Sequence, residues 1–230
     1  MSHPVPESPR YEVKLACAPD RLPAVRSWVR EHPALFCGTY PPRQVNNVYL
    51  DTVAGDDLFA HLSGVGRREK LRFRWYGEDH TAVRGSLELK CRSGHLGWKQ
   101  QCVIPRCFDL GRISWYEWMA QVRALAEGPA RTWLASVERP TMINVYRREY
   151  FEASEGQIRL TLDHPMSVYD QIMYASPNLS FAVPLERQII VEIKASLALW
   201  RRLPEVLSRF PLRASRNSKY VRGMQGILSS

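Results

Sequence analysis

The sequence predicts an α+β fold in which eight strands form a closed barrel or a sandwich and helices flank its apolar faces. Three observations lead to this prediction. Eight segments have the period-two alternation or the β-branched and aromatic content of strands. Three others have apolar residues at helical spacing. The chain of 230 residues has no internal repeat or long linker, so we expect one domain over 1–230, with 1–8 as a flexible tail.

The N-terminal half is predicted to contain five strands and one helix. Residues 9–17 read as a strand because charged and apolar side chains alternate along them. A helix over 20–31 follows, since its apolar residues recur at helical spacing: Leu22, Val25 and Val29. The next strands are bounded by turn-forming residues and cover 44–51, 67–77, 84–92 and 97–104.

The C-terminal half is predicted to begin with a helix over 114–126, whose apolar stripe comprises Trp115, Trp118, Met119, Val122 and Leu125. Strands follow over 142–152, 157–163 and 187–195, and the segment 170–186 between the last two reads as an irregular loop. Helical spacing returns over 198–209. A final helical run extends to Leu228, and Asn217 or Ser218 would be a good N-cap for it.

The strand 67–77 has the most regular alternation in the chain. One face would carry four cations, and the other would carry large apolar side chains. The cations are Arg68, Lys70, Arg72 and Arg74, and the apolar residues are Leu71, Phe73 and Trp75. Because like charges on one strand face repel one another, such a row persists only if it is solvated or faces a strong anion.

The same alternation of charged and apolar residues recurs on four other predicted strands. Their charged faces include Arg10, Glu12 and Lys14; Glu88, Lys90 and Arg92; Arg159 and Asp163; and Glu192 and Lys194. A conventional barrel with its polar face in water would explain any one of these strands. The apolar faces are large, however, and amphipathic helices are available to bury them. We therefore expect an inside-out barrel whose charged lumen holds water, a polyanion and a divalent cation.

Composition agrees with an anionic partner. Thirty-two Lys and Arg against twenty-three Asp and Glu give a net charge of +9, which favours nucleic acid, phosphate chains or acidic lipid. No run is long enough to span a membrane and the N-terminus lacks the apolar core of a signal peptide, so we expect a cytoplasmic protein. Five cysteines without a CxxC pair are expected to be free thiols.

A nucleic-acid-binding module is the main rival from another class. It would need aromatic side chains on the same exposed face as the cations, so that bases could stack there. Phe73 and Trp75 fall instead on the face opposite Arg72 and Arg74. We therefore expect no nucleic-acid partner.

Several motifs carry a family resemblance. The run RYEVK over 10–14 resembles the N-terminal Glu-x-Glu-x-Lys signature of the triphosphate tunnel metalloenzymes, within the CYTH-like superfamily, with Arg10 in place of the first Glu. That replacement is similar to what the VTC-type polyphosphate polymerases have. Further matches follow in the expected order: VYLDT (48–52), KLRFRWYG (70–77), LELK (87–90), YRREY (146–150), IRLTLD (158–163), VEIK (191–194) and SKY (218–220).

The resemblance implies a tunnel barrel of eight antiparallel strands that holds ATP, triphosphate or polyphosphate together with Mn²⁺ or Mg²⁺. By position it makes Lys14, Arg72, Arg74, Lys90, Arg148, Arg159 and Lys219 phosphate ligands, and Glu192 the metal carboxylate. We add Arg68, Lys70, Lys194 and Ser218 as phosphate-binding residues, and Glu12 and Glu88 as further metal candidates. Where fungal members have an additional tunnel arginine, this chain offers His61 or Arg68.

The function implied is a stand-alone polyphosphate polymerase, in which Arg72, Arg74 and Lys90 act on the γ-phosphoryl group of ATP and a polyphosphate end attacks it. Water as the attacking group would give a triphosphatase, and a tunnel without turnover would give a polyphosphate sensor. Arg10 favours the polymerase, because losing the first carboxylate of the signature leaves one metal where hydrolytic relatives would use two. The sequence leaves the oligomeric state open.

Overall fold

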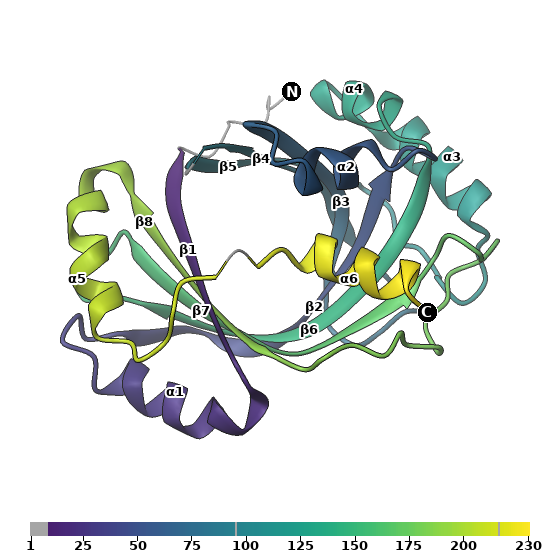
Figure 1. Cartoon of the computed structure of the whole chain (residues 1–230). Helices are drawn as coiled ribbons and strands as arrows, with labels where there is room; N and C mark the ends of the chain where they lie inside the picture. Colours follow the sequence, from purple (N-terminus) through teal and green to yellow (C-terminus); the bar gives the residue numbers. More distant parts are fainter. Residues whose placement is uncertain (1–8, 95, 216) are drawn as a thin grey trace.

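The computed structural model describes residues 9–94, 96–215 and 217–230, and its centre is a closed barrel of eight antiparallel strands (Figure 1). This confirms the predicted fold class. Around the barrel the strands run in the order β1 (Arg10–Cys17), β5 (Leu96–Val103), β4 (Gly85–Ser93), β3 (Arg67–Tyr76), β2 (Cys37–Asp51), β6 (Arg139–Glu152), β7 (Ile158–Asp170) and β8 (Ile189–Ser196).

The barrel closes where β1 meets its two neighbours. β1 pairs along its whole length with β8, from Arg10 opposite Ser196 to Cys17 opposite Ile189. At the seam with β5, the described residues pair at Arg10 with Gly97 and at Tyr11 with Leu96. Further along β1, a side-chain hydrogen bond from Lys90 of β4 to Glu12 joins β1 to the strands beyond β5.

The outward face of β3 confirms the inside-out arrangement. Leu71, Phe73 and Trp75 are buried against α3 (Trp115–Leu125), and the Phe73 ring lies edge-on to Trp118 with centroids 5.3 Å apart. A capping box begins this helix: the Ser114 hydroxyl accepts from the Glu117 N–H and the Glu117 carboxylate accepts from the Ser114 N–H. The short helix α4 (Pro129–Ala135) adds Trp133 and Leu134 to the same core.

A second apolar layer covers the outer faces of β1, β7 and β8. It contains α1 (Leu22–Arg30), which follows a 3₁₀ turn η1 (Pro19–Arg21), and α5 (Leu203–Ser208), which follows a 3₁₀ segment η2 (Leu197–Arg202). Val25 and Val29 of α1 and Leu203 and Val206 of α5 are buried there. Figure 1 shows α1 and α5 on one side of the barrel, and α3 and α4 on the other.

The last helix, α6 (Lys219–Leu228), lies across the opening of the barrel in Figure 1. Met224 and Tyr220 pack with Met142 of β6, Val168 of β7 and Leu58 of α2 (Asp56–Leu62). The helix approaches β6 so closely at Gly223 that a Cβ there would overlap the Met142 side chain. The segment before α6 bonds to β1, where the Ser215 N–H donates to the Lys14 carbonyl at 2.8 Å.

The predicted elements are present, with differences in extent. β2 begins at Cys37 instead of residue 44, and β7 continues through Pro165 to Asp170 instead of ending at 163. The helix predicted over 198–209 starts as a 3₁₀ segment, while α2 and α4 were not predicted. Residues 171–188 contain no helix or strand, as expected for the loop. The predicted tail, 1–8, lies outside the described residues.

None of the helices in the described part of the chain is long and apolar enough to cross a membrane. The five cysteines are free thiols, as predicted.

Candidate functional site

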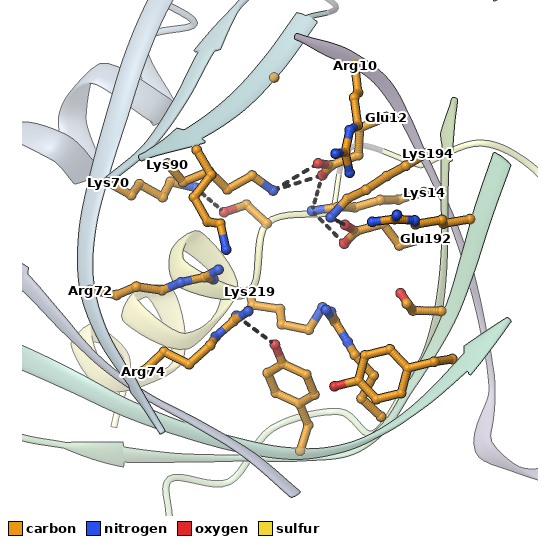
Figure 2. A pocket seen from close by; sticks show the side chains of 18 of the residues that line it. Arg10, Glu12, Lys14, Lys70, Arg72, Arg74, Lys90, Glu192, Lys194 and Lys219 are labelled. Atoms are coloured by element: carbon orange, nitrogen blue, oxygen red, sulfur yellow. Dashed lines mark hydrogen bonds and ion pairs between the residues drawn. The ribbon is translucent and has the colours of Figure 1, made fainter. Parts of the chain in front are cut away.

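A cavity of about 530 Å³ lies inside the barrel, and all eight strands and the start of α6 contribute to its wall. Among the described residues, eleven cations and three carboxylates line it. The cations are Arg10, Lys14, Lys70, Arg72, Arg74, Lys90, Lys99, Arg148, Arg159, Lys194 and Lys219, and the carboxylates are Glu12, Glu152 and Glu192. The charged side chains labelled in Figure 2 reach toward one another from opposite walls.

Glu88, on the inner face of β4, fixes one group of cations from beneath. Its carboxylate is almost completely buried and does not line the cavity. It accepts from Arg72 Nη2 at 2.6 Å and from Lys99 Nζ at 2.9 Å, and it lies 3.6 Å from Arg74 Nη1. Burial raises the pKa of Glu88, but Arg72 and Arg74 outweigh it and hold the pKa below its usual range. Glu88 is therefore an anionic support for the cations that face the cavity.

Asp163 plays the same part for a second group. Arg148 donates to both oxygens of this buried carboxylate, at 2.5 and 2.6 Å, and Lys219 Nζ lies 2.5 Å from it. Burial raises the pKa of Asp163, yet Arg148 and Lys219 lower it to about 2. The pairing aligns a cation from β6 with one from α6, so the C-terminal helix contributes to the site.

A third group of charges stands in the cavity itself, on the side of β1 and β8 (Figure 2). Lys90 Nζ bridges both oxygens of Glu12 at 3.0 Å, across the seam between β1 and the rest of the sheet. Lys14 Nζ lies 3.3 Å from Glu12 and 3.9 Å from Glu192, and Lys194 Nζ lies 2.8 Å from Glu192. Burial and repulsion from the Glu192 carboxylate raise the pKa of Glu12. The nearby lysines outweigh both effects and hold that pKa below its usual range; they are Lys90, Lys14 and Lys194.

Glu12 and Glu192 are the carboxylates that fit a divalent cation. Both face the cavity and both lie near Lys14. Opposite Glu192 in the register, Thr161 Oγ1 is buried without a hydrogen-bond partner in the described chain. Hard cations such as Mg²⁺ or Mn²⁺ take oxygen ligands and keep several waters or phosphate oxygens, so two carboxylates suffice. No cluster of three or more His, Cys, Asp or Glu occurs among the described residues.

Burial, together with the nearby cations, shifts two lysines toward their neutral form. Burial lowers the pKa of Lys90 to about 8, with Lys14 adding to this and Glu12 opposing it. Burial, together with Lys14 and Lys90, places the pKa of Lys70 well below its usual range, and Lys70 Nζ donates to Ser218 Oγ at 2.7 Å. A polyanion in the cavity would favour the charged form of both lysines.

Most of the residues predicted from the sequence meet in this cavity. Those that line it are Lys14, Lys70, Arg72, Arg74, Lys90, Arg148, Arg159, Lys194, Ser218, Lys219, Glu12 and Glu192. Arg68 and Glu88 are not part of the lining, and neither is His61. Arg159 pairs with Glu152 at 3.3 Å and its side chain is largely exposed.

The sequence reasoning missed several residues of the wall. Arg10 was placed on a charged strand face but not among the phosphate-binding residues, and Lys99 is a single cation on its strand; both line the cavity. Charge alternation does not identify uncharged residues, so the tyrosines of the wall were not predicted. They are Tyr40, Tyr49, Tyr76, Tyr146 and Tyr150 on strands, and Tyr220 on α6. Asp163 stood within a quoted motif, but its pairing with Lys219 joins positions far apart in sequence.

Comparison with known proteins agrees with the fold. Residues 9–228 match the family model of the VTC domain. No curated protein gives a significant match to the sequence.

Solved structures resemble the whole chain at low identity. A Hippeastrum protein, named as a candidate adenylyl cyclase with dominant triphosphatase activity, has a TM-score of 0.55 and 17% identity, covering 94% of this chain and 96% of that one. A candidate adenylate cyclase from Vibrio parahaemolyticus has a TM-score of 0.50 and 12% identity, covering 96% and 99%. A chain of the Schizosaccharomyces pombe Mediator head module has a TM-score of 0.50 and 9% identity, covering 90% and 97%. At these identities the likeness concerns the fold alone.

Proposed function

The chain belongs to the VTC domain family, and we propose that it is a polyphosphate polymerase that transfers the γ-phosphoryl group of ATP to the end of a polyphosphate chain inside the barrel. The observation that carries the proposal is the ring of eleven cations around a cavity with three carboxylates. A linear phosphate chain carries about one negative charge per unit, so it matches a continuous cationic wall better than a compact anion does.

The deep arginines are suited to the transferred phosphoryl group. Phosphoryl transfer depends mainly on in-line positioning and on neutralising the charge of the equatorial oxygens. Arg72 and Arg74 offer planar donor forks on one wall, and Arg148 offers a third from the wall of β6. Because Glu88 and Asp163 bind them on the inner face of the barrel, these guanidinium groups are oriented before substrate arrives, and little reorganisation is required.

Lys90 and Lys14 supply compact charges next to the two cavity carboxylates. Glu192 and Glu12 are the residues that would hold Mn²⁺ or Mg²⁺, and the cation would supply further positive charge to the phosphate oxygens. On binding phosphate, Lys90 and Lys194 would exchange carboxylate partners for phosphate oxygens, which remain anionic acceptors.

The reaction balances without a further reagent. A terminal oxygen of the polyphosphate chain forms a bond to the γ-phosphorus of ATP, and the bond from that phosphorus to the β–γ bridging oxygen breaks. The electron pair remains on the β-phosphate of ADP, whose charge Lys and Arg side chains of the wall stabilise. The chain grows by one phosphate in each turnover.

A triphosphatase is the second candidate. It is favoured by the similarity of fold to the Hippeastrum protein with dominant triphosphatase activity. Hydrolysis would need a water held in line with the scissile bond, and Glu12 or Glu192 would be the bases nearest to it. Arg10 argues against a triphosphatase, because it replaces the first glutamate of the signature. Two carboxylates, Glu12 and Glu192, therefore lie at the β1–β8 wall instead of three.

Product analysis separates these functions. The protein is incubated with ATP labelled at the γ-phosphate and with Mn²⁺, and the products are resolved by chain length. We expect labelled long-chain polyphosphate together with ADP. Labelled orthophosphate without a chain product would identify a triphosphatase instead, and tight polyphosphate binding without turnover would identify a sensor.

A further inference from the structure

Three tyrosines stand at one end of the cationic cavity. Tyr40 of β2, Tyr76 of β3 and Tyr150 of β6 all line it. Tyr40 and Tyr76 are 63% and 46% exposed, which leaves large aromatic surfaces in water where the cavity begins. Exposed aromatic groups beside a polar site are typical of ligand recognition, because each ring offers an apolar face with little conformational freedom to lose.

The tyrosines continue the rows of phosphate-binding cations. Tyr76 comes two residues after Arg74 on β3, and Tyr150 comes two residues after Arg148 on β6, so each shares the inward face of its strand. Two residues of strand advance about 7 Å. A ligand that extends from the arginines along either strand therefore reaches an aromatic ring next.

Arg43 holds these rings in place. Its guanidinium lies 3.9 Å from the centroid of the Tyr76 ring and 5.1 Å from that of Tyr150, and its Nε donates to the Tyr150 hydroxyl at 3.0 Å. The Tyr40 and Tyr150 rings meet edge to face, with centroids 5.7 Å apart. The group is thus ordered before any ligand binds, while much of the surface of Tyr40 and Tyr76 remains open.

We propose that Tyr40, Tyr76 and Tyr150 form the base-binding subsite for the nucleoside triphosphate donor. This rests on the proposed use of ATP in the barrel. A nucleotide has an aromatic base at one end and a run of negative charge at the other, and the cavity has the matching order of rings and cations. The base stacks at the tyrosines, and the triphosphate runs inward so that its γ-phosphoryl group reaches Arg72, Arg74 and Arg148.

With this subsite, the protein should distinguish ligands that have a nucleobase from ligands that have none. It should not distinguish one nucleobase from another. Stacking uses the ring face, which every nucleobase has, so ATP and GTP are expected to bind comparably. Inorganic tripolyphosphate has the same charged run without a base. Substitutions at the tyrosines are therefore expected to affect the nucleotide and to spare tripolyphosphate.

The test compares the binding of ATP and of inorganic tripolyphosphate, each with Mn²⁺, by isothermal titration calorimetry. The variants are Tyr40→Ala with Tyr76→Ala, the matched Tyr40→Phe with Tyr76→Phe, and Tyr116→Ala as a control on α3, where the side chain is 85% exposed outside the barrel. Stacking on an aromatic ring changes affinity by roughly 5- to 100-fold per base. We expect a loss of that size for ATP in the double alanine variant, and less than a two-fold change for tripolyphosphate.

The phenylalanine pair, which keeps the rings, is expected to retain the binding of ATP. Equal losses for ATP and tripolyphosphate, or no loss for either, would overturn the base subsite and leave the proposed phosphate tunnel standing. Failure of both ligands to bind the wild-type protein would overturn the proposed function together with the subsite.

Discussion

Two buried carboxylates inside the barrel, Glu88 and Asp163, determine where its deep cations point. Each is buried, and each bonds to cations from different elements: Glu88 to Arg72 of β3 and Lys99 of β5, and Asp163 to Arg148 of β6 and Lys219 of α6. Buried ion pairs contribute little net stability compared with apolar packing, but breaking one leaves an uncompensated charge. Their role here is to orient the cations.

Asp163→Asn is expected to lower the free energy of unfolding by about 3–5 kcal/mol at neutral pH, because Arg148 and Lys219 would lose their buried counter-charge. Chemical denaturation measures this directly. Glu205→Gln is the control, since its partner Arg202 is a surface residue and the exposed pair contributes within about 1 kcal/mol. Equal stability of the two variants would contradict the role of Asp163.

The same aspartate gives a pH dependence with a definite sign. Its pKa is about 2 in the folded protein, below the ordinary aspartate value of 3.8. The stability it contributes is therefore complete above the unfolded pKa and is lost as the pH falls through about 2. Between pH 5 and pH 2 the wild type should lose more stability than Asp163→Asn, and parallel acid-unfolding curves would contradict this.

Arg72→Ala is expected to reduce kcat by roughly 100- to 1,000-fold, because a preoriented donor to the transferred phosphoryl group is removed. Arg72→Lys should recover part of the rate, since it restores the charge but not the planar fork. Arg67→Ala is the matched control on the same strand, because its side chain is 73% exposed and does not line the cavity. A kcat within two-fold of wild type for Arg72→Ala would exclude the proposed role.

At the scale of elements, one tyrosine links α6 to the barrel both by a hydrogen bond and by ring stacking. The Tyr220 hydroxyl donates to Asp51 Oδ2 at 2.5 Å, and the same carboxylate accepts from the N–H groups of Asp57 and Leu58 at the start of α2. The Tyr220 ring also stacks on Tyr49 of β2, with centroids 5.0 Å apart. Asp51 therefore links α2 and α6 on one side of the cavity.

Tyr220→Phe is expected to destabilise the docking of α6 by about 1–3 kcal/mol, the range for losing a hydrogen bond to a charged group. Hydrogen exchange of the α6 amides should become faster, while the amides of β3 and β4 keep their protection. Tyr116→Phe, on the exposed face of α3, should change neither set. Unchanged exchange in α6 would show that packing alone holds the helix.

How much the sequence predicted depended on the periodicity of each element. Strands with strict alternation, such as 67–76, were predicted almost to the residue. The first half of β2 was missed because Gly38, Pro41 and Pro42 are turn signals, and it pairs with β6 alone through two register shifts. Helices of seven residues, α2 and α4, are too short for a helical period to be visible.

The site was predictable where charge alternated within a strand, and less so where contacts join distant strands. Lys14, Arg72 and Glu192 were found because neighbours two residues away share their face. Arg68 shares that periodicity, yet it lies beyond Lys70 outside the cavity lining, because alternation gives the face of a strand and not the depth along it. The supporting pairs of Glu88 and Asp163 needed the register between strands.

At the scale of the whole molecule, the barrel concentrates positive charge in a confined space, so its ligand binding should depend on pH. Burial lowers the pKa of Lys90 to about 8. Burial raises the pKa of Tyr146, but Arg148 and Arg74 outweigh it and lower that pKa to about 8 as well. Above about pH 8 the Lys90 ammonium becomes neutral and the Tyr146 hydroxyl becomes an anion. Both changes weaken the binding of a polyanion in the cavity.

Between pH 7 and pH 9 the wild type should therefore lose roughly ten-fold more affinity for tripolyphosphate than a Lys90→Arg variant, whose charge persists. Adding Tyr146→Phe to Lys90→Arg should reduce the remaining change in tripolyphosphate affinity between the two pH values. Binding constants from calorimetry at the two pH values give the comparison. Identical pH profiles for the wild type and Lys90→Arg would contradict the assigned pKa of Lys90.

The central claim is that the lumen of this barrel is a binding site for a linear phosphate chain. A crystal structure of the protein with tripolyphosphate and Mn²⁺ tests it most directly. The expected result is a phosphate chain inside the cavity, in contact with Arg72, Arg148 and Lys219, and anomalous scattering from Mn²⁺ beside Glu192. Tripolyphosphate bound on the outer surface, with the cavity side chains still paired as in Figure 2, would contradict the claim.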